Sequence, residues 1–280
     1  MISFLEETDA PQILSLWQTC FGDDEAYIQF FLAHAFPLCR GIAAREEGRV
    51  VSMLFLLPGS LTQGETNLPA AYVYAVCTDP LFRSRGLAAG LIRFARDHAK
   101  DLGNVEALCL LPAEEGLYDY YARLGFRTAF ARVRRIWAVS AADAVPLPLA
   151  PCVPAAARNR RWARLGYFAW EAPMLRYMDR EHRFTGGQVV QWEGGTAYVC
   201  LEDGTLSCQE LCAPAAETGA ALERLAATCG VREGTALLSA DCAADGGELE
   251  PGGMLLPLTA EAEAWLHRTK GRAYLGFPLE

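Results

Sequence analysis

The spacing of apolar residues changes along the chain between the helical period and the alternation of strands, and each change marks a predicted element. After Pro11 the apolar residues recur three and four apart as far as Gly22, which is expected to end a helix. The residues predicted to face inward from this helix are Ile13, Leu14, Trp17 and Phe21. A second helix is expected between a cap at Asp23 or Asp24 and a stop near Pro37.

Strand patterns begin at residue 41. A hairpin is predicted over 41–59, with its turn at Gly48 and its end at Pro58. The stretch AYVYAVCTD, residues 71–79, is apolar on both faces and is predicted to be a central strand. The other elements expected in this half are a short strand over 2–5, helices over 86–102 and 116–124, and strands over 105–111 and 126–139. Together they predict an α+β domain over residues 1–140.

A proline-rich stretch follows. Residues 141–157 hold four prolines, which exclude regular ladders or helix over most of the stretch, so a linker is predicted there. After the linker the order of elements repeats: a helical segment over 159–180, a hairpin over 186–202, a strand over 205–212, a helix over 215–229, a strand over 235–241, a helix over 260–268 and a strand over 272–277. This repeat of pattern predicts a second, degenerate copy of the first domain over 158–280.

Composition and charge exclude several classes of protein. With 52% hydrophobic and 21% charged residues, the 280-residue chain can build ordinary folded cores. A formal net charge of -9 argues against a nucleic-acid partner, because phosphate binding depends on positive charge. No apolar run approaches the ~18 residues that a membrane span requires, and the first residues are acidic where a secretory leader is basic. We therefore expect a cytoplasmic protein that binds no membrane.

The cysteines predict neither a disulfide framework nor a metal site. The sequence has 10 cysteines, scattered through apolar runs in a chain that is long enough to build a core, so reduced and buried thiols are expected. The closest pair in sequence is Cys208 and Cys212, and no second pair or nearby histidine gives the spacing of a zinc site. No metal is predicted.

The loop LFRSRGLAAG joins the strand at 71–79 to the following helix and contains a candidate anion-binding motif. A strand that leads through R-x-x-G-x-A into a helix gathers unpaired backbone N–H groups at the positive end of the helix, which favours an anion. Gly86 lets a phosphate approach the main chain closely, and Arg83 and Arg85 add charge. The alternative is a surface loop with solvated arginines. Neither a dinucleotide fingerprint nor a P-loop is present.

The stretch VCTDPLFRSRGLAAGLI, followed after one strand by LYDYYARLGF, resembles the acetyl-coenzyme-A-binding core of the GCN5-related N-acetyltransferase (GNAT) superfamily. The resemblance covers residues 1–139 well and the second half only by its order of elements. The segment LLPAEEGLYDYYARLGF further resembles the enhanced-intracellular-survival type, in which tandem domains of this fold occur. The second half has CAPAAETG in place of RSRGLAAG, so it is not expected to bind the cofactor.

The resemblance implies roles for individual residues. The main chain of Val76, Cys77 and Thr78 would pair with the pantetheine arm of acetyl-coenzyme A, and an N–H of Cys77 or Thr78 would stabilise the oxyanion. The residues that would hold the pyrophosphate are Arg83, Ser84, Arg85, Gly86, Leu87, Ala88 and Ala89. An acyl-cysteine intermediate at Cys77 is disfavoured, because a buried strand thiol has no reason to ionise.

Tyr121 matches the tyrosine of the family that faces the thioester sulfur, because it stands five residues before Phe126. When an amine attacks the acetyl carbonyl, the leaving thiolate needs a proton, and a phenol can supply it. The alternative is a core aromatic that packs with Leu117 and Leu124 on one helical face. The upstream loop favours the role as general acid.

The acceptor end of the site is the least defined by the sequence. Asp24, Glu25 and Tyr74 are candidates for contact with the substrate, and Asp23 and Asp79 are further candidates for a base. Glu280 is a candidate base through a C-terminal carboxylate, as the enhanced-survival type implies. A water relay is an alternative to any of these carboxylates.

These observations predict an N-acetyltransferase that moves an acetyl group from acetyl-coenzyme A to a primary amine of a small molecule or peptide. A module that binds acyl-coenzyme A without catalysis is the alternative of a different class. The acceptor, the acyl length and the oligomeric state do not follow from the sequence.

Overall fold

The computed structural model describes residues 1–138, 155–192, 195–202 and 204–276. The chain divides into two compact units, each assembled from separate segments. The first unit comprises Met1–Ser60, Leu68–Arg127 and Leu255–Ala264, and the second comprises Leu61–Asn67, Thr128–Met254 and Trp265–Glu280. The linker expected over 141–157 lies almost wholly outside the described residues. The domain limits 1–140 and 158–280 stay a prediction.

The first unit is an α+β sheet with helices between its strands. Its elements are β1 (Ile2–Phe4), α1 (Ala10–Phe21), α2 (Glu25–His34), β2 (Arg40–Glu46), β3 (Arg49–Gln63), β4 (Thr66–Thr78), the 3-10 turn η3 (Pro80–Phe82), α3 (Leu87–Asp97), β5 (Ala107–Leu110) and α4 (Glu115–Arg123). The strands follow the order β1-β2-β3-β4-β5. β2 is antiparallel to β1 and β3, whereas β4 and β5 are parallel.

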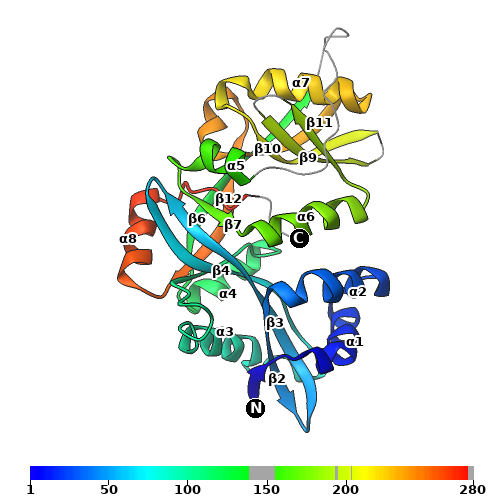
Figure 1. Ribbon diagram of the computed structural model, residues 1–280, viewed down its shortest axis with the longest axis vertical. Coiled ribbons are helices and arrows are strands. Elements are labelled where there is room, and N and C mark those ends of the chain that lie inside the picture. The colour runs from blue at the N-terminus through cyan, green and yellow to red at the C-terminus, as the bar shows by residue number, and fades with distance from the viewer. Residues whose placement is uncertain (139–154, 193–194, 203, 277–280) are drawn as a thin grey trace. The chain divides into compact units, whose positions relative to one another are not determined.

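Helices cover these strands from two sides. Figure 1 draws α1 and α2 to one side of β3, and α3 and α4 to the other. The buried Trp17 of α1 has its ring centroid 5.7 Å from that of Phe55 on β3 and 5.9 Å from that of Tyr74 on β4. On α3, a Cβ at Gly90 would stand 3.1 Å from Cδ1 of Ile2, so the small residue allows the helix to approach β1. These contacts place the end of α1 over β4 and the start of α3 beside the sheet.

Three local expectations for this half were wrong. The buried face of α1 is built on Ile13, Leu16 and Trp17, while Phe21 at the end of the helix is 46% exposed and Leu14 is half-buried. β3 does not end at Pro58 but runs to Gln63, because the fixed φ of proline is compatible with an extended chain. The helix expected to reach residue 102 ends at Asp97, and turns then carry the chain back toward β5.

The second unit repeats the alternation of strands and helices. Its elements are β6 (Arg127–Ala138), α5 (Ala155–Trp162), β7 (Tyr167–Trp170), α6 (Ala172–Phe184), β8 (Gln188–Trp192), β9 (Gly195–Glu202), β10 (Thr205–Cys212), the 3-10 turn η4 (Ala215–Glu217), α7 (Thr218–Cys229), β11 (Glu233–Ser239), the 3-10 segment η5 (Ala240–Asp245), β12 (Glu248–Pro257) and α8 (Ala260–Thr269). The end of β12 and the start of α8 lie in the segment Leu255–Ala264, which belongs to the first unit. The strand order is β12-β6-β11-β10-β9-β8. β10 is parallel to β11 and antiparallel to β9.

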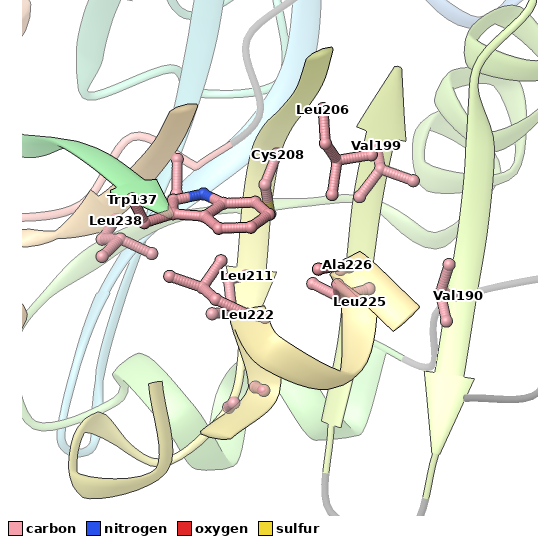
Figure 2. Close-up of a cluster of buried hydrophobic side chains, with 14 of the residues drawn as sticks. Trp137, Val190, Val199, Leu206, Cys208, Leu211, Leu222, Leu225, Ala226 and Leu238 are labelled. Atoms are coloured by element: carbon pink, nitrogen blue, oxygen red, sulfur yellow. The ribbon is translucent and has the colours of Figure 1, made fainter. Parts of the chain in front are cut away.

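The core of the second unit lies between α7 and its strands. Figure 2 shows Leu222 and Leu225 of α7 facing side chains from the strands. The strand residues of this cluster include Trp137, Val190, Val199, Leu206, Cys208, Leu211 and Leu238. Each is at most 8% exposed, so α7 is held by apolar burial, as the helical spacing of its sequence predicts.

The sequence missed two strands of this unit and predicted one that is absent. The expected helical segment 159–180 is interrupted by β7, because Gly166 has a left-handed φ of 88° and ends the helical path. β12 was not expected at all. The strand predicted over 272–277 is reduced to single bridges at Ala273 and Tyr274, and Phe277 lies outside the described residues. No helix in the described part of the chain has the length and apolar character to span a bilayer.

Candidate functional site

The end of β4 extends past its partner β5. The register of the two strands pairs Ala70, Ala71 and Tyr72 with Ala107, Leu108 and Cys109, and β5 ends at Leu110. At Ala75 the backbone takes a left-handed φ of 49°, which an L-residue rarely adopts. Such a bulge turns the following side chains to the opposite face of the strand. The last residues of β4 therefore present main-chain groups that β5 does not use.

The opposite edge of this strand end is anchored to β3. The Ser52 hydroxyl donates to the carbonyl oxygen of Cys77 at 2.7 Å and lies 2.8 Å from the Thr78 hydroxyl, and the N–H of Asp79 donates to Val51. Because neighbouring residues of a strand point their main-chain groups to opposite edges, the groups of Val76 point away from β3. The main-chain N–H and C=O groups of Val76 are therefore placed to donate to and accept from an extended ligand.

The loop after β4 forms a main-chain cradle at the start of α3, residues 83–89. Ser84 and Gly86 both have left-handed φ, 62° and 71°. Outside helices and strands, no backbone hydrogen bond of the described residues has an N–H of 83–89 as its donor, and the first N–H groups of α3 have no acceptor within the helix. A Cβ at Gly86 would meet no atom within 4 Å, so the space in front of this residue is open. Unpaired N–H groups at the positive end of a helix fit an anion such as a pyrophosphate.

Arginines surround the cradle. Arg83 donates from Nε to the carbonyl of Thr78 at 3.2 Å and forms no ion pair with a carboxylate in the described residues. Arg85 lies 4.9 Å from the ring centroid of Phe82 and 3.4 Å from the carboxylate of Glu46. Because both side chains are exposed, their charge is available to a ligand.

Tyr121 is buried on α4, with 8% of its surface exposed. Its ring lies edge-on to Phe126 and to Tyr120, at centroid distances of 5.6 and 5.1 Å. Burial raises the pKa of Tyr121 to about 12, and the neighbouring Tyr120 adds to the rise. The phenol therefore keeps its proton at neutral pH, which a general acid requires.

The acceptor candidates fall into two groups. Tyr74 is 9% exposed, and its hydroxyl lies 3.0 Å from the hydroxyl of Tyr27 on α2. The rings of both tyrosines contact the ring of Trp17. Asp24 is exposed at the start of α2, and Glu25 accepts a hydrogen bond from Gln29 at 2.7 Å. These three residues come from β4 and α2 in one unit.

The other base candidates already have structural partners. Asp23 accepts a hydrogen bond from the indole of Trp17 at 2.7 Å. Asp79 is paired with Arg49 at 2.6 Å and accepts from the N–H of Leu81 at 2.9 Å, which fixes η3. Glu280 lies outside the described residues. No group of three or more histidine, cysteine or acidic side chains that could hold a metal occurs in the described ranges.

Residues 1–129 match the family model described as an acetyltransferase (GNAT) domain. This part of the chain is a GNAT acetyltransferase domain. It is accordingly an acyltransferase domain whose co-substrate is acetyl-coenzyme A, as the sequence motifs implied. The resemblance stated from the two motifs is confirmed, whereas the role of each site residue stays a prediction.

Solved structures share the fold over nearly the whole chain. A probable N-acyltransferase from Enterococcus faecalis has a TM-score of 0.71 at 13% identity, over 94% of this chain and 73% of that one. Eis1 from Mycobacterium abscessus has a TM-score of 0.67 at 17% identity, over 94% and 75%. A tandem GNAT protein from the clavulanic acid biosynthesis pathway has a TM-score of 0.50 at 16% identity, over 92% and 99%. No curated protein matches the sequence.

These structures cover both units, which confirms the α+β fold with two GNAT copies. Sequence reasoning pointed to the loop before α3 because its signal is local, and the binding role of this loop stays a prediction. The same reasoning did not connect Cys20 of α1 with Cys77 of β4, whose side chain lowers the pKa of Cys20 to about 7 although burial opposes this.

Proposed function

We propose that this protein transfers the acetyl group of acetyl-coenzyme A directly to a primary amine of a small molecule or peptide. The observation that carries the proposal is the cradle: unpaired N–H groups over 83–89 at the start of α3, beside a strand end with free main-chain groups. A diphosphate fits the cradle, and an extended amide-bearing arm fits the edge of Val76.

Acetyl-coenzyme A supplies the activated acetyl group when bound. The chain would contribute the main chain of Val76, Cys77 and Thr78 along the pantetheine arm, and Arg83 to Ala89 around the phosphates. An N–H on this strand would stabilise the oxyanion that forms when the amine attacks. A protein site that fixes these groups in advance lowers the barrier mainly by orientation and electrostatics.

Tyr121 would donate the proton that the leaving thiolate needs. Its burial supports this role, because the neutral phenol is favoured and keeps its proton until the thiolate forms. Asp23 and Asp79 are held by Trp17 and Arg49, so deprotonation of the acceptor would fall to Asp24, Glu25 or a water relay.

The decisive experiment is calorimetric binding of acetyl-coenzyme A to the wild type, Gly86→Glu and Gly219→Glu. The carboxylate introduced by Gly86→Glu would place a negative charge in the open space of the cradle. Because about two charge-assisted contacts with the phosphates would be lost, the affinity for acetyl-coenzyme A should fall roughly 100-fold or more. Gly219 is the control for the added charge: it is exposed at the start of α7, and a Cβ there meets no atom within 4 Å. Because only Gly86 of the two has a left-handed φ, the backbone strain of Gly86→Glu is followed separately by thermal unfolding. Gly219→Glu should bind like the wild type.

Turnover is measured as release of coenzyme A, separated by chromatography, with polyamines, aminoglycosides, amino acids and peptides as acceptors. Absence of calorimetric binding, or equal binding by Gly86→Glu in a folded protein, contradicts the cradle. Binding without turnover on every acceptor class contradicts the transfer and favours a binding module. Thermal unfolding of the variants separates a lost site from a lost fold.

A further inference from the structure

A cavity of about 450 Å³ lies at the end of β10 in the second unit. Its walls come from α5, from the ends of β8 and β10, and from the start of β9. All the described residues that line it belong to the second unit, so it is separate from the cradle at 83–89. A volume of this size lies within the range of roughly 300–1,000 Å³ that is usual for small-molecule sites.

A row of side chains crosses the strand ends beside this cavity. The register pairs Gln191 of β8 with Thr196 of β9, and Thr196 with Cys212 of β10. Residues directly opposite each other in a sheet point to the same face. On this face α5 packs over the end of β10, because Ala157 and Trp162 lie in one apolar cluster with Cys212 (Figure 1). Thr196 and Cys212 are consequently buried, at 2% and 3% exposed.

Arg161 of α5 is a fixed part of the wall. Its Nε donates to the carbonyl oxygen of Ala213. Its two terminal nitrogens donate to the carboxylate of Asp241 at 2.6 and 3.0 Å, and one of them also donates to the Ser239 hydroxyl at 3.0 Å. Because the carboxylate of Asp241 balances its charge, Arg161 shapes the cavity and adds little net charge to it.

Arg160 supplies the charge that is not balanced. It precedes Arg161 on α5 and lines the same cavity, but its side chain is exposed and forms no ion pair with a carboxylate of the described residues. Among the described residues that line the cavity, none is acidic. The site therefore favours a ligand with one negative charge, and the planar guanidinium suits a carboxylate best.

The indole of Trp192 supplies a planar apolar surface. Trp192 is paired in register with Gly195, and a Cβ at Gly195 would stand only 2.3 Å from Cζ2 of the indole. The ring therefore lies directly against the glycine main chain. Trp192 also packs against the apolar cluster beneath α7, which holds the ring in place. A fixed indole favours a ligand with an aromatic ring, because such rings pack in preferred offset or edge-on arrangements.

We propose that this cavity binds a small aromatic carboxylate, with its ring against Trp192 and its carboxylate paired with Arg160. The side-chain amide of Gln191 and the hydroxyl of Thr196 supply further hydrogen-bonding groups for substituents on the ring. A diphosphate is disfavoured, because only one of the two arginines in the wall has a charge to spare. The proposed site does not depend on the proposed acetyl transfer.

The test is calorimetric titration of the full-length protein with 2-naphthoate and two analogues. 2-Naphthamide keeps the rings without the charge, and it should bind about tenfold more weakly because the charge-assisted contact is lost. Decahydro-2-naphthoate keeps the charge on saturated rings, and it should bind about fivefold more weakly because the aromatic contact is lost.

Variants assign the binding to the cavity. Arg160→Gln should weaken the binding of 2-naphthoate about tenfold. Arg164→Gln is the matched control, because Arg164 is also exposed, follows α5, and does not line the cavity; it should bind like the wild type. Trp192→Leu should remove the preference for 2-naphthoate over its saturated analogue. Thermal unfolding checks that this variant is folded, and Arg160→Gln tests the site without altering the core.

The proposal is overturned if 2-naphthoate does not bind at millimolar concentrations, or if 2-naphthamide binds equally well. It is also overturned if Arg160→Gln and Arg164→Gln have the same affinity, or if acetyl-coenzyme A displaces 2-naphthoate, which would place the probe in the cradle. A protein that binds acetyl-coenzyme A but not 2-naphthoate refutes the aromatic carboxylate site alone. A protein that binds 2-naphthoate but not acetyl-coenzyme A refutes the proposed function alone.

Discussion

The end of β4 in the first unit and the end of β10 in the second have similar local structure. They differ in the partners of the arginine side chain that lies beside each strand end. Each strand carries a cysteine near its end, Cys77 or Cys212, and in each the carbonyl of the next residue accepts from the Nε of an arginine. A 3-10 turn and a helix follow in both. The partners of the two arginines, Arg83 and Arg161, separate the copies.

Arg161 comes from α5 and is 10% exposed, and its guanidinium lies 2.6 Å from the carboxylate of Asp241 and 3.0 Å from the Ser239 hydroxyl. Burial opposes ionisation of Asp241, but its hydrogen bonds from Arg161 and Ser239 outweigh burial and keep its pKa below the ordinary value. Arg83 comes from the loop itself and has no carboxylate partner among the described residues. The comparison teaches that the second copy ties its arginine into an ion pair, whereas the first leaves its arginine exposed, as our proposed site requires.

The copies also differ after the next strand, and this difference gives the largest expected effect. β5 leads into α4 with Tyr121, whereas β11 leads into η5, whose sequence ADCAAD has no tyrosine. Tyr121→Phe removes only the hydroxyl from a buried ring. We expect kcat to fall by roughly 100-fold to 10,000-fold, the usual value of a positioned general acid, with nearly unchanged binding of acetyl-coenzyme A.

Tyr120→Phe is the matched control for this measurement. Tyr120 neighbours Tyr121 on α4 but is only half-buried, and its replacement should leave kcat within about twofold. Steady-state turnover and calorimetric binding are measured on both variants. If Tyr121→Phe turned over at the wild-type rate, Tyr121 would not be the general acid. The two copies would then differ only at the cradle.

Replacing each of the two arginines by alanine gives the next effect in size. Arg83→Ala should weaken acetyl-coenzyme A binding about tenfold, because one charge-assisted contact is lost, and change stability by less than about 0.5 kcal/mol. Arg161→Ala should leave that binding unchanged and destabilise the second unit by about 1–3 kcal/mol, because Asp241 loses its partner while partly exposed.

Calorimetry and denaturant unfolding of both variants measure the two effects together. If Arg83→Ala destabilises the fold as much as Arg161→Ala, the first arginine is structural and the two strand ends serve the same purpose. If Arg161→Ala weakens the binding of acetyl-coenzyme A, the second copy is not free of the cofactor.

The first half of the fold was predictable because its signals are local. Gly22 ends α1 in a left-handed conformation, and the loop at 83–89 leads into α3 as the motif required. That the second half does not bind the cofactor, expected from the absent basic residues in CAPAAETG, stays a prediction. The sequence thus predicted the turn and helix start at 83–89, whereas phosphate binding there stays a proposal.

The rest depends on partners that are distant in sequence. The turn-forming Pro251, Gly252 and Gly253 concealed β12, which becomes a strand only because other strands pair with it. Arg158 and Glu210 are surface residues by type, yet both are at most 2% exposed and form an ion pair inside the second unit. Residue type alone predicts such pairs poorly, because each partner needs the other to be buried.

An irregularity in the backbone of β4 leads to the smallest expected effect. Each of the two compared strands has an irregularity before its cysteine: Ala75 with a φ of 49°, and a register shift between Cys208 and Glu210 around Gln209. Only Ala75 is left-handed, which costs an L-residue about 1–2 kcal/mol, whereas glycine loses about 0.5–1 kcal/mol in chain entropy. Ala75→Gly should therefore stabilise the protein by about 0.5 kcal/mol, while Gln209→Gly should destabilise it by a similar amount. Denaturant unfolding of the two variants measures the opposite signs, and a destabilised Ala75→Gly would mean that the alanine methyl group contributes more than the strain it bears.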